Sequence, residues 1–422
     1  MSHVANKAGW ALAIVLGGLL ILAAAQVARG GSLDPPGLPG STMKTLDEVE
    51  PRTPISSLPY VISQPGSYYV TTDLTGVSGQ HGITINSHNV TLDLNGFTLT
   101  GVPGALDGIH ANAFSSIAIR NGMVRLWPGD GIDAASAGWG RFEGITANNN
   151  TGDGISVGSH SLLEECVSYS NGGDGVEAQA DARISNCEAL SNTLMGFRLT
   201  HNTTLHDCLA ADNSLNGIYM AGEAIAVSRC SAEGNLSVGI WANGPHHLVE
   251  GCIVKNSGAV GVRLSGAGSV IRDCSVSFSA NQGIHIIGAN SRATGNSVVD
   301  HAAFAAIWVQ AAHVTVDHNY AATSAWGIYV QGTQAVVENN TVIETNNEGI
   351  FALAAVATAC TIEGNTVTGA STGYSVAANL GCSIVRNVAK ANTTNYAIGG
   401  GNDVGPITTG AAQASPAGNV AN

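Results

Sequence analysis

The 422-residue chain is predicted to fold as an all-β solenoid, and three features of its sequence predict this. A short unit recurs along most of the chain, with successive copies 21 to 26 residues apart. Within each unit, apolar and polar residues alternate in short runs, and Gly, Asn, Asp and Ser separate these runs. A fixed period of this length is typical of solenoids, and the alternation indicates strands and turns rather than helices.

Two positions recur in every unit. The first, here called the anchor, is a small residue before an apolar one, and it is found at Gly82, Gly108, Gly131, Gly154, Gly175, Gly196, Gly217, Gly239, Gly261, Gly283, Ala306, Gly327, Gly349, Gly373 and Ala397. The second follows 12 to 16 residues later, at Asn95, Asn121, Gly144, Cys166, Cys187, Cys208, Cys230, Cys252, Cys274, Asn296, Asn319, Asn340, Asn365 and Asn387. Because the two columns stay in register, each unit is predicted to be one coil.

The apolar residues of each coil are predicted to line a continuous interior. After the anchor Gly154, Ile155 and Val157 are apolar and Ser156 between them is polar. A second strand is expected before the Cys/Asn column, where Leu163 and its equivalents are apolar. Side chains alternate between the two faces of a strand, so stacked coils bury one face and leave the other outside.

The repeated units, such as DGISVGSHSLLEECVSYSN from Asp153, make the chain resemble the right-handed parallel β-helix proteins of the pectate-lyase-like superfamily. Their repeats carry the same Gly-Ile strand and an Asn ladder at a tight bend. The resemblance covers residues 82 to about 402 and implies an all-β, right-handed parallel β-helix of about 14 coils with an N-terminal cap. That superfamily contains lyases, hydrolases, epimerases, phage tailspikes and uncharacterised exported bacterial members, so the resemblance leaves the activity open.

The remaining segments are assigned by composition. Residues 1–25 are apolar from Trp10 and end with Ala23 and Ala25, which is typical of a secretory signal peptide; an uncleaved membrane anchor is the alternative. Residues 26–41 form a Pro/Gly linker, 42–81 the N-terminal cap, 82–402 the β-helix and 403–422 a loose C-terminal tail. The protein is therefore expected to be secreted or held at the cell surface, with no membrane contact beyond the signal segment.

The composition excludes one class of partner. Charged residues make up 11% of the chain and the formal net charge is −14. Nucleic-acid binding requires a basic surface, so no nucleic-acid partner is expected. An acidic surface rich in hydroxyls and amides is better suited to sugars or divalent cations.

Eight cysteines leave two alternatives open. Six of them occupy one column, and Cys360 and Cys382 lie 22 residues apart in a later part of the chain. Neighbouring coils place equivalent Cα atoms about 5 Å apart, which permits disulfides. Alternatively, cysteine replaces Asn as a small residue that packs well at a bend.

The second residue after each anchor is expected to point outward, and this position is called the outward column. Aromatic residues, amides and a carboxylate gather in it and two residues beyond it. The predicted substrate-binding residues are Glu177, Trp241, Asn243, Trp308, Gln310, Tyr329, Gln331 and Phe351. A sugar presents an apolar ring face and hydroxyls at its edge, so this surface suits a polysaccharide. Stacking of aromatics across strands is the structural alternative.

The same column contains groups that a polysaccharide lyase would need. Arg198, Tyr219, Arg263 and His285 are the candidate catalytic residues, because a lyase neutralises a carboxylate and removes a proton with a base. A glycoside hydrolase would need two carboxylates, and Asp133 and Glu177 stand two coils apart, or about 10 Å. The Asn-Thr-Asp and Arg-Ile-Lys motifs of similar polygalacturonases are missing, so no residue is assigned from them.

Four aspartates immediately precede the anchors of successive coils: Asp107, Asp130, Asp153 and Asp174. Stacked carboxylates repel one another, and a Ca²⁺ ion would relieve this repulsion with oxygen ligands. Turn formation by Asp-Gly explains the same residues without a metal. Ca²⁺ at these four residues is therefore one of two interpretations.

These patterns predict an exported β-helix protein that binds an acidic or cell-wall polysaccharide along the outward column. Lyase or hydrolase activity is left open. The alternative function is a non-catalytic surface or matrix rod for adhesion or spacing.

Overall fold

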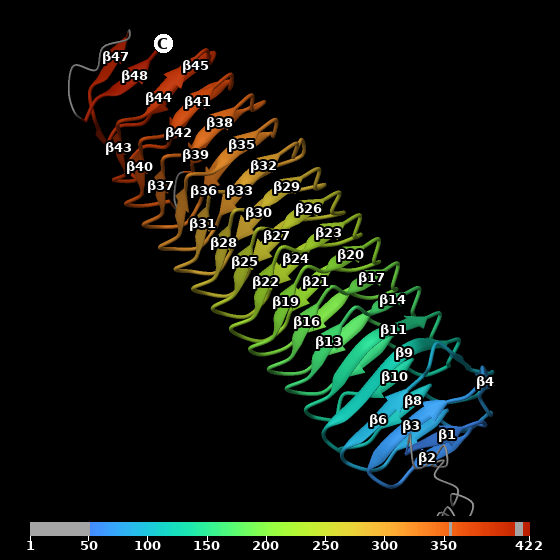
Figure 1. Ribbon diagram of the computed structural model, residues 1–422. Helices are drawn as coiled ribbons and strands as arrows, with labels where there is room; N and C mark the ends of the chain where they lie inside the picture. The colour runs from blue at the N-terminus through green and yellow to red at the C-terminus, as the bar shows by residue number, and fades with distance from the viewer. Residues whose placement is uncertain (1–50, 354–356, 410–416) are drawn as a thin grey trace, which may run out of the picture. The chain divides into compact units, whose positions relative to one another are not determined.

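The computed structural model describes residues 51–353, 357–409 and 417–422. The predicted signal peptide, the linker and the start of the predicted cap lie outside the described residues. Residues Arg52–Asn422 form one parallel β-solenoid, and the described residues contain no helix. Within them, nothing helical is therefore long and apolar enough to span a bilayer. Figure 1 shows the coils following one another in sequence order along the solenoid.

One face of the solenoid is a sheet of 16 parallel strands, one from each coil. Its strands begin at or near the anchors. They are β2 (Tyr60–Ile62), β5 (Ile83–Ile85), β8 (Ile109–Ala111), β10 (Ile132–Ala134), β12 (Ile155–Val157), β15 (Val176–Ala178), β18 (Phe197–Leu199), β21 (Ile218–Met220), β24 (Ile240–Ala242), β27 (Val262–Leu264), β30 (Ile284–Ile286), β33 (Ala305–Val309), β36 (Trp326–Val330), β39 (Glu348–Ala352), β42 (Thr372–Val376) and β45 (Thr394–Ile398).

The second face lies before the Cys/Asn column. It contains β1 (Arg52–Ile55), β3 (Gly66–Val70), β6 (Val90–Asp93), β13 (Leu162–Glu164), β16 (Arg183–Ser185), β19 (Thr204–His206), β22 (Ala226–Ser228), β25 (Leu248–Glu250), β28 (Val270–Arg272), β31 (Arg292–Thr294), β34 (Thr315–Asp317), β37 (Val336–Glu338), β40 (Thr361–Glu363), β43 (Ser383–Val385) and β46 (Asp403–Val404).

The third face lies after that column. It contains β4 (Leu74–Thr75), β7 (Thr98–Thr100), β14 (Val167–Tyr169), β17 (Glu188–Leu190), β20 (Leu209–Ala211), β23 (Ser231–Glu233), β26 (Ile253–Lys255), β29 (Ser275–Ser277), β32 (Ser297–Val299), β35 (Tyr320–Ala322), β38 (Thr341–Ile343), β41 (Thr366–Thr368), β44 (Val388–Lys390), β47 (Ile407–Thr409) and β48 (Asn419–Ala421). The long strands β9 (Ile117–Arg125) and β11 (Arg141–Asn148) join the second and third faces into one sheet of 32 strands.

The fold class is confirmed, and the number of coils is slightly larger than expected. Sixteen strands form the first sheet, against about 14 predicted coils. Most coils have three strands where the sequence indicated two, because the Cys/Asn column marks the bend between the second and third. From Cys166 onward, the residue before this column has a left-handed backbone, as at Asp207 (φ 55°), and turns the chain there.

The pairing extends beyond the limits expected from the repeat. Strand β2 pairs in parallel with β5, and β3 pairs with β6, so part of the segment assigned to the cap continues the sheets. At the other end, β48 pairs with β44. These pairings use backbone hydrogen bonds, which do not require the residues that recur in each unit.

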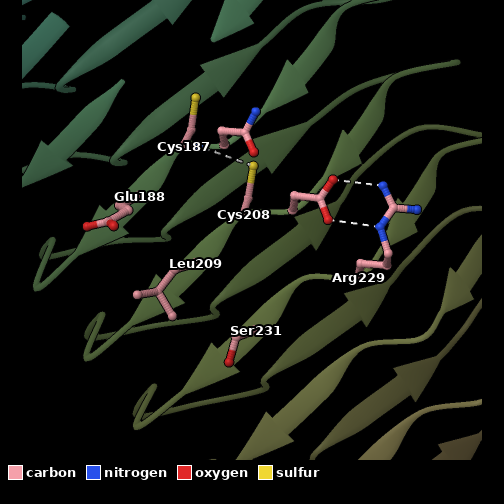
Figure 2. Close-up of a pocket in the computed structure, with 8 residues that line it drawn as sticks. Cys187, Glu188, Cys208, Leu209, Arg229 and Ser231 are labelled. Carbon is pink, nitrogen blue, oxygen red and sulfur yellow. Dashed lines mark hydrogen bonds and ion pairs between the residues drawn. The ribbon is translucent and has the colours of Figure 1, made fainter. Parts of the chain in front are cut away.

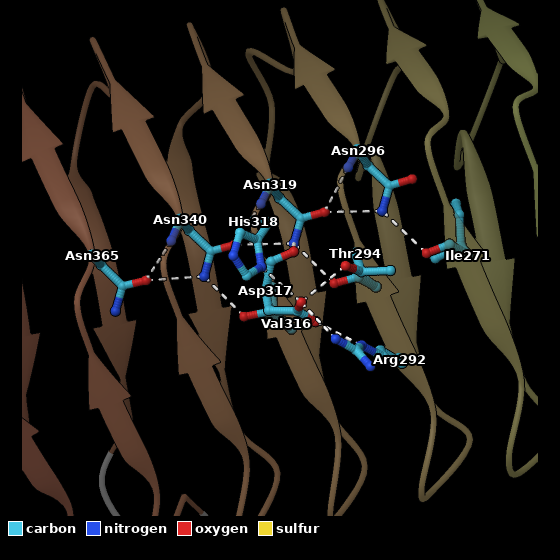
Figure 3. A network of polar contacts seen from close by, with 11 residues as sticks. Ile271, Arg292, Thr294, Asn296, Val316, Asp317, His318, Asn319, Asn340 and Asn365 are labelled. Carbon is cyan, nitrogen blue, oxygen red and sulfur yellow. Dashed lines mark hydrogen bonds and ion pairs between the residues drawn. The ribbon is translucent and has the colours of Figure 1, made fainter.

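The interior is one continuous hydrophobic core. The alternation places Ile155 and Val157 inside, each fully buried. Anchors are small because coils approach closely: a Cβ at Gly175 would lie 2.7 Å from the carbonyl oxygen of Gly196. At the bend, buried amides form a ladder that replaces water as the partner of the backbone (Figure 3).

Candidate functional site

The outward column forms a continuous row on the 16-stranded sheet. Strand register pairs each member with the next, as in Tyr219 with Trp241 and Trp241 with Arg263. The predicted members in order are Glu177, Arg198, Tyr219, Trp241, Arg263, His285, Trp308, Tyr329 and Phe351. The structure therefore brings the predicted substrate-binding and catalytic residues together, while their roles remain predictions.

At one end of the row, the cation of Arg198 is already paired. Its Nη1 donates to Glu177 Oε1 at 2.7 Å. Gln179 adds a longer contact of 3.4 Å to the same oxygen. Glu177 and Arg198 therefore neutralise one another, which leaves Arg198 less available for a ligand than the sequence suggested.

Tyr219 and Trp241 form the next part of the row. Their rings meet edge to face, with centroids 5.2 Å apart. Asn243 Nδ2 donates to the Tyr219 hydroxyl at 2.9 Å, and Trp241 Nε1 donates to Ser265 Oγ at 2.9 Å. These bonds fix the polar tips of both aromatic side chains at the surface.

Arg263 differs from Arg198 in its surroundings. Its guanidinium lies over the Trp241 ring, 5.2 Å from the centroid. Among the described residues, no carboxylate forms an ion pair with it, and its buried Nε has no hydrogen-bond partner. From Tyr219 to Phe351 the outward column contains no Asp or Glu. Arg263 therefore leaves a local positive charge on an acidic protein.

His285 is held between its neighbours and is only 7% exposed. It stacks on Trp308 at 4.3 Å, and its Nε2 lies 2.7 Å from Gln310 Oε1. Because an amide oxygen only accepts, Nε2 carries the proton and Nδ1 does not. Burial, together with the Arg263 charge, lowers the pKa of His285 to about 4. The imidazole is therefore neutral at physiological pH.

The aromatic end of the row is a stacked ladder. Tyr329 lies between Trp308, at 6.0 Å, and Phe351, at 5.0 Å, with nearly parallel rings. Gln331 accepts from Trp308 Nε1 at 3.1 Å and donates to the Tyr329 hydroxyl at 2.8 Å. The ring faces cover one another, so a ligand meets ring edges and polar tips rather than free faces. This stacking supports the structural alternative as well.

Two aromatic residues of this cluster were missed from the sequence. Phe304 lies 4.9 Å from Trp308, and Trp326 lies 6.2 Å from Tyr329. Trp326 occupies the position of the aspartates before the anchor, and its Nε1 donates to Glu348 Oε2 at 2.7 Å. A search of that column would have found Trp326. Phe304 precedes its anchor by two residues and follows no repeated pattern.

The four aspartates predicted to bind Ca²⁺ form a ladder to the backbone. Oδ1 of Asp107 accepts from the amide of Asp130, and Oδ1 of Asp130 from that of Asp153, at 2.8 and 2.7 Å. The pattern continues to Asp174 and Met195. Burial raises the pKa of Asp130 to about 6 and that of Asp153 to about 7. These bonds use only Oδ1 of each carboxylate, and Oδ2 of Asp107 lies 3.1 Å from His81 Nδ1. The residues therefore fit Ca²⁺ only in part, and the ladder alone explains them.

A separate cavity of about 440 Å³ lies on the 32-stranded sheet, beside the cysteine column (Figure 2). Asp207 and Arg229 form a double ion pair across it, at 2.8 and 2.7 Å. All eight cysteines are buried free thiols, and Cys208 Sγ accepts from the amide of Cys187 at 3.4 Å. The thiol thus takes the position of the Asn oxygen, in agreement with the packing interpretation of the cysteines.

The chain matches a family model described as right handed beta helix region over residues 107–247 and 238–393. The chain belongs to this family. No curated protein sequence matches the chain. Among solved structures, the chain is similar to the A-module of mannuronan C-5 epimerase AlgE4 of Azotobacter vinelandii, at 13% identity and a TM-score of 0.37, covering 77% of this chain and 88% of that one.

Another similar structure is the tailspike protein of the E. coli bacteriophage HK620. Its identity is 13% and the TM-score is 0.43, and the match covers 81% of this chain and 72% of that one.

Proposed function

We propose that this right-handed β-helix protein is exported and binds an acidic polysaccharide along the outward column from Tyr219 to Phe351. The observation that carries the proposal is Arg263, a cation without a carboxylate partner among the described residues, set in a row of amide and aromatic groups. A uronate carboxylate would pair with its guanidinium. Sugar hydroxyls would bond to the exposed side chains of Asn243 and Gln310 and to the half-buried Gln331.

The geometry suits a long ligand better than a small one. The row repeats at one residue per coil, about 4.8 Å apart, along the 16-stranded sheet. A regular chain of sugars can contact several coils in succession, and each contact adds a small increment of binding energy. Repetition of weak contacts therefore replaces the deep pocket that a small ligand needs.

The first test replaces Arg263 by glutamine and measures affinity for an oligouronate by titration calorimetry. We expect about tenfold weaker binding, because one charge-assisted contact is lost. The matched control is Arg229→Gln on the other sheet, where Asp207 already pairs with the arginine. Equal loss in both variants, or equal binding of a neutral glucan by the unchanged protein, contradicts the proposal.

One observation favours lyase activity as a second function. A neutral His285 stands beside Arg263 in register, so a base adjoins a group that can neutralise a carboxylate. Tyr219 is two coils from Arg263, with Trp241 between them, and is less well placed. In this mechanism Arg263 binds the uronate carboxylate and His285 Nδ1 accepts the adjacent carbon-bound proton. The bond between the next carbon and the glycosidic oxygen breaks as the C=C bond forms, and the leaving oxygen takes a proton from water.

This mechanism predicts a specific pH profile. Cleavage of an oligouronate, followed by the ultraviolet absorbance of the unsaturated ends, is expected to be constant above pH 5. It should fall as the pH drops through about 4, where His285 becomes protonated. His285→Gln should abolish cleavage and leave affinity within about twofold. If the unchanged protein binds the oligouronate without producing unsaturated ends, it is a binding protein and not a lyase.

A further inference from the structure

Two histidines and two aspartates converge near the N-terminal end of the 16-stranded sheet. His81 and Asp107 each precede an anchor, while His110 and Asp133 occupy the outward column of β8 and β10. Ligand atoms of His81, Asp107 and His110 all lie within 4.8 Å of one another. Asp133 Oδ2 lies 2.9 Å from His110 Nδ1 and adds a fourth group. Three successive coils contribute to this cluster.

One ring nitrogen of His110 has a lone pair that no hydrogen-bond donor contacts. Its Nε2 lies 3.2 Å from Asn112 Oδ1, and an amide oxygen accepts, so the ring proton sits on Nε2. Nδ1 then faces two carboxylate oxygens, at 3.4 Å from Asp107 and 2.9 Å from Asp133. This Nδ1 is buried and has no hydrogen-bond partner. A lone pair beside two anionic oxygens is unfavourable, and a metal cation bound among these groups would relieve the repulsion.

The carboxylate of Asp107 is directed toward the same position beside His110 Nδ1. Its Oδ1 is occupied by the amide of Asp130, at 2.8 Å. Its Oδ2 therefore faces the histidines, 3.1 Å from His81 Nδ1 and 3.4 Å from His110 Nδ1. Such outer hydrogen bonds are typical of the groups that orient metal ligands.

The separations agree with a small tetrahedral ion. Nitrogen and oxygen ligands at 2.0 to 2.1 Å from zinc are about 3.3 Å apart in a tetrahedron. Within the group of His81, Asp107 and His110, the two nitrogen–oxygen distances are 3.1 and 3.4 Å. Ca²⁺ prefers six to eight oxygens at longer distances, whereas imidazole nitrogen suits zinc and similar ions.

We propose that His81, Asp107 and His110 bind one divalent transition-metal ion of the zinc class, with Asp133 beside His110. Three protein ligands leave one position of a tetrahedral shell for water, and the ion links two successive coils. His81 is the weakest ligand, because its Nδ1 also accepts from the amide of Asp107, at 3.2 Å. The site shares Asp107 with the four aspartates predicted to bind Ca²⁺ but not the other three. It does not depend on polysaccharide binding.

The test uses untagged protein freed of metal with a chelator. Titration calorimetry with Zn²⁺ is expected to give one site per chain, and thermal unfolding should shift to higher temperature on saturation. Co²⁺ should give the intense visible bands of a four-coordinate site. Asn112→Ala, which removes an outer hydrogen bond, should weaken Zn²⁺ binding about tenfold.

Variants of the ligands decide the outcome. His110→Gln is expected to weaken Zn²⁺ binding at least a hundredfold, and Asp133→Asn, which changes a neighbour of His110, about tenfold. Both variants should keep the β circular dichroism spectrum. The matched control is His160→Gln, because His160 also faces an aspartate, Asp181, at 3.6 Å but belongs to no group of three ligands within the part of the chain that the structure describes. The proposal is overturned if Zn²⁺ does not bind stoichiometrically, if His160→Gln loses as much, or if Ca²⁺ alone saturates the site.

Discussion

Asn319→Leu is expected to lower the free energy of unfolding by about 3 kcal/mol. Asn319 is 2% exposed and stands in the amide ladder of the bend between the second and third faces (Figure 3). Its Oδ1 accepts from the backbone and side-chain nitrogens of Asn296, at 3.0 and 2.9 Å, and its Nδ2 donates to Ala293 O at 2.9 Å. Leucine fills the volume but leaves these buried groups without this partner, and that is the larger cost.

Chemical denaturation measures this effect, and two further variants calibrate it. Asn319→Cys should lose only about 1 kcal/mol, because cysteine occupies the same position in other coils and its sulfur accepts the equivalent bond. Asn346→Leu, at an exposed bend of a nearby coil, should change stability little. If the leucine and cysteine variants of Asn319 are equally stable, the ladder is not what holds the bend.

Asp153→Asn is expected to stabilise the protein at pH 8 by about 2 kcal/mol. Burial raises the pKa of Asp153 to about 7 from 3.8, so its charged form is disfavoured in the folded state. Asparagine keeps the acceptor oxygen without the charge. Asn216 shows that it fits, because it occupies the equivalent position and accepts from the amide of Val238 at 3.1 Å.

The pH dependence has a defined sign. Because the folded pKa is raised, the stabilising contribution of Asp153 is fully present below pH 3.8 and is lost as the pH rises through about 7. Thermal unfolding between pH 4 and 8 should therefore show a smaller decline for Asp153→Asn than for the unchanged protein. The exposed Asp181→Asn serves as control. An equal decline in all three proteins contradicts this explanation.

The same measurement tests the predicted Ca²⁺ site. A bound cation stabilises the charged carboxylates and opposes their raised pKa values. Ca²⁺ should then raise the unfolding temperature of the unchanged protein at pH 8 and have less effect on Asp153→Asn. If Ca²⁺ has no effect on either protein, the aspartates serve only the backbone amides.

Much of the outward column could be predicted because a regular spacing in the sequence of a solenoid places equivalent residues next to one another in space. Residues one period apart, such as Tyr219 and Trp241, must lie on neighbouring strands, and the alternation decides which side they face. The period also identified the core positions and the Cys/Asn bend. Where the period is absent, as before Gly82, the sequence did not reveal that β2 and β3 continue the sheets.

The sequence by itself determined the fold class, the coils and the order of residues in the outward column. Only the tertiary structure decided which polar and charged side chains already have a partner within the protein. Arg198 and Arg263 are equivalent in the repeat, yet one pairs with Glu177 and the other lies over Trp241. The period of the sequence determines where each Cα lies. The side-chain torsions and the residues of neighbouring coils determine where the charged group of that residue lies. For the same reason, the convergence of His81 with His110 from two different columns became visible only in three dimensions.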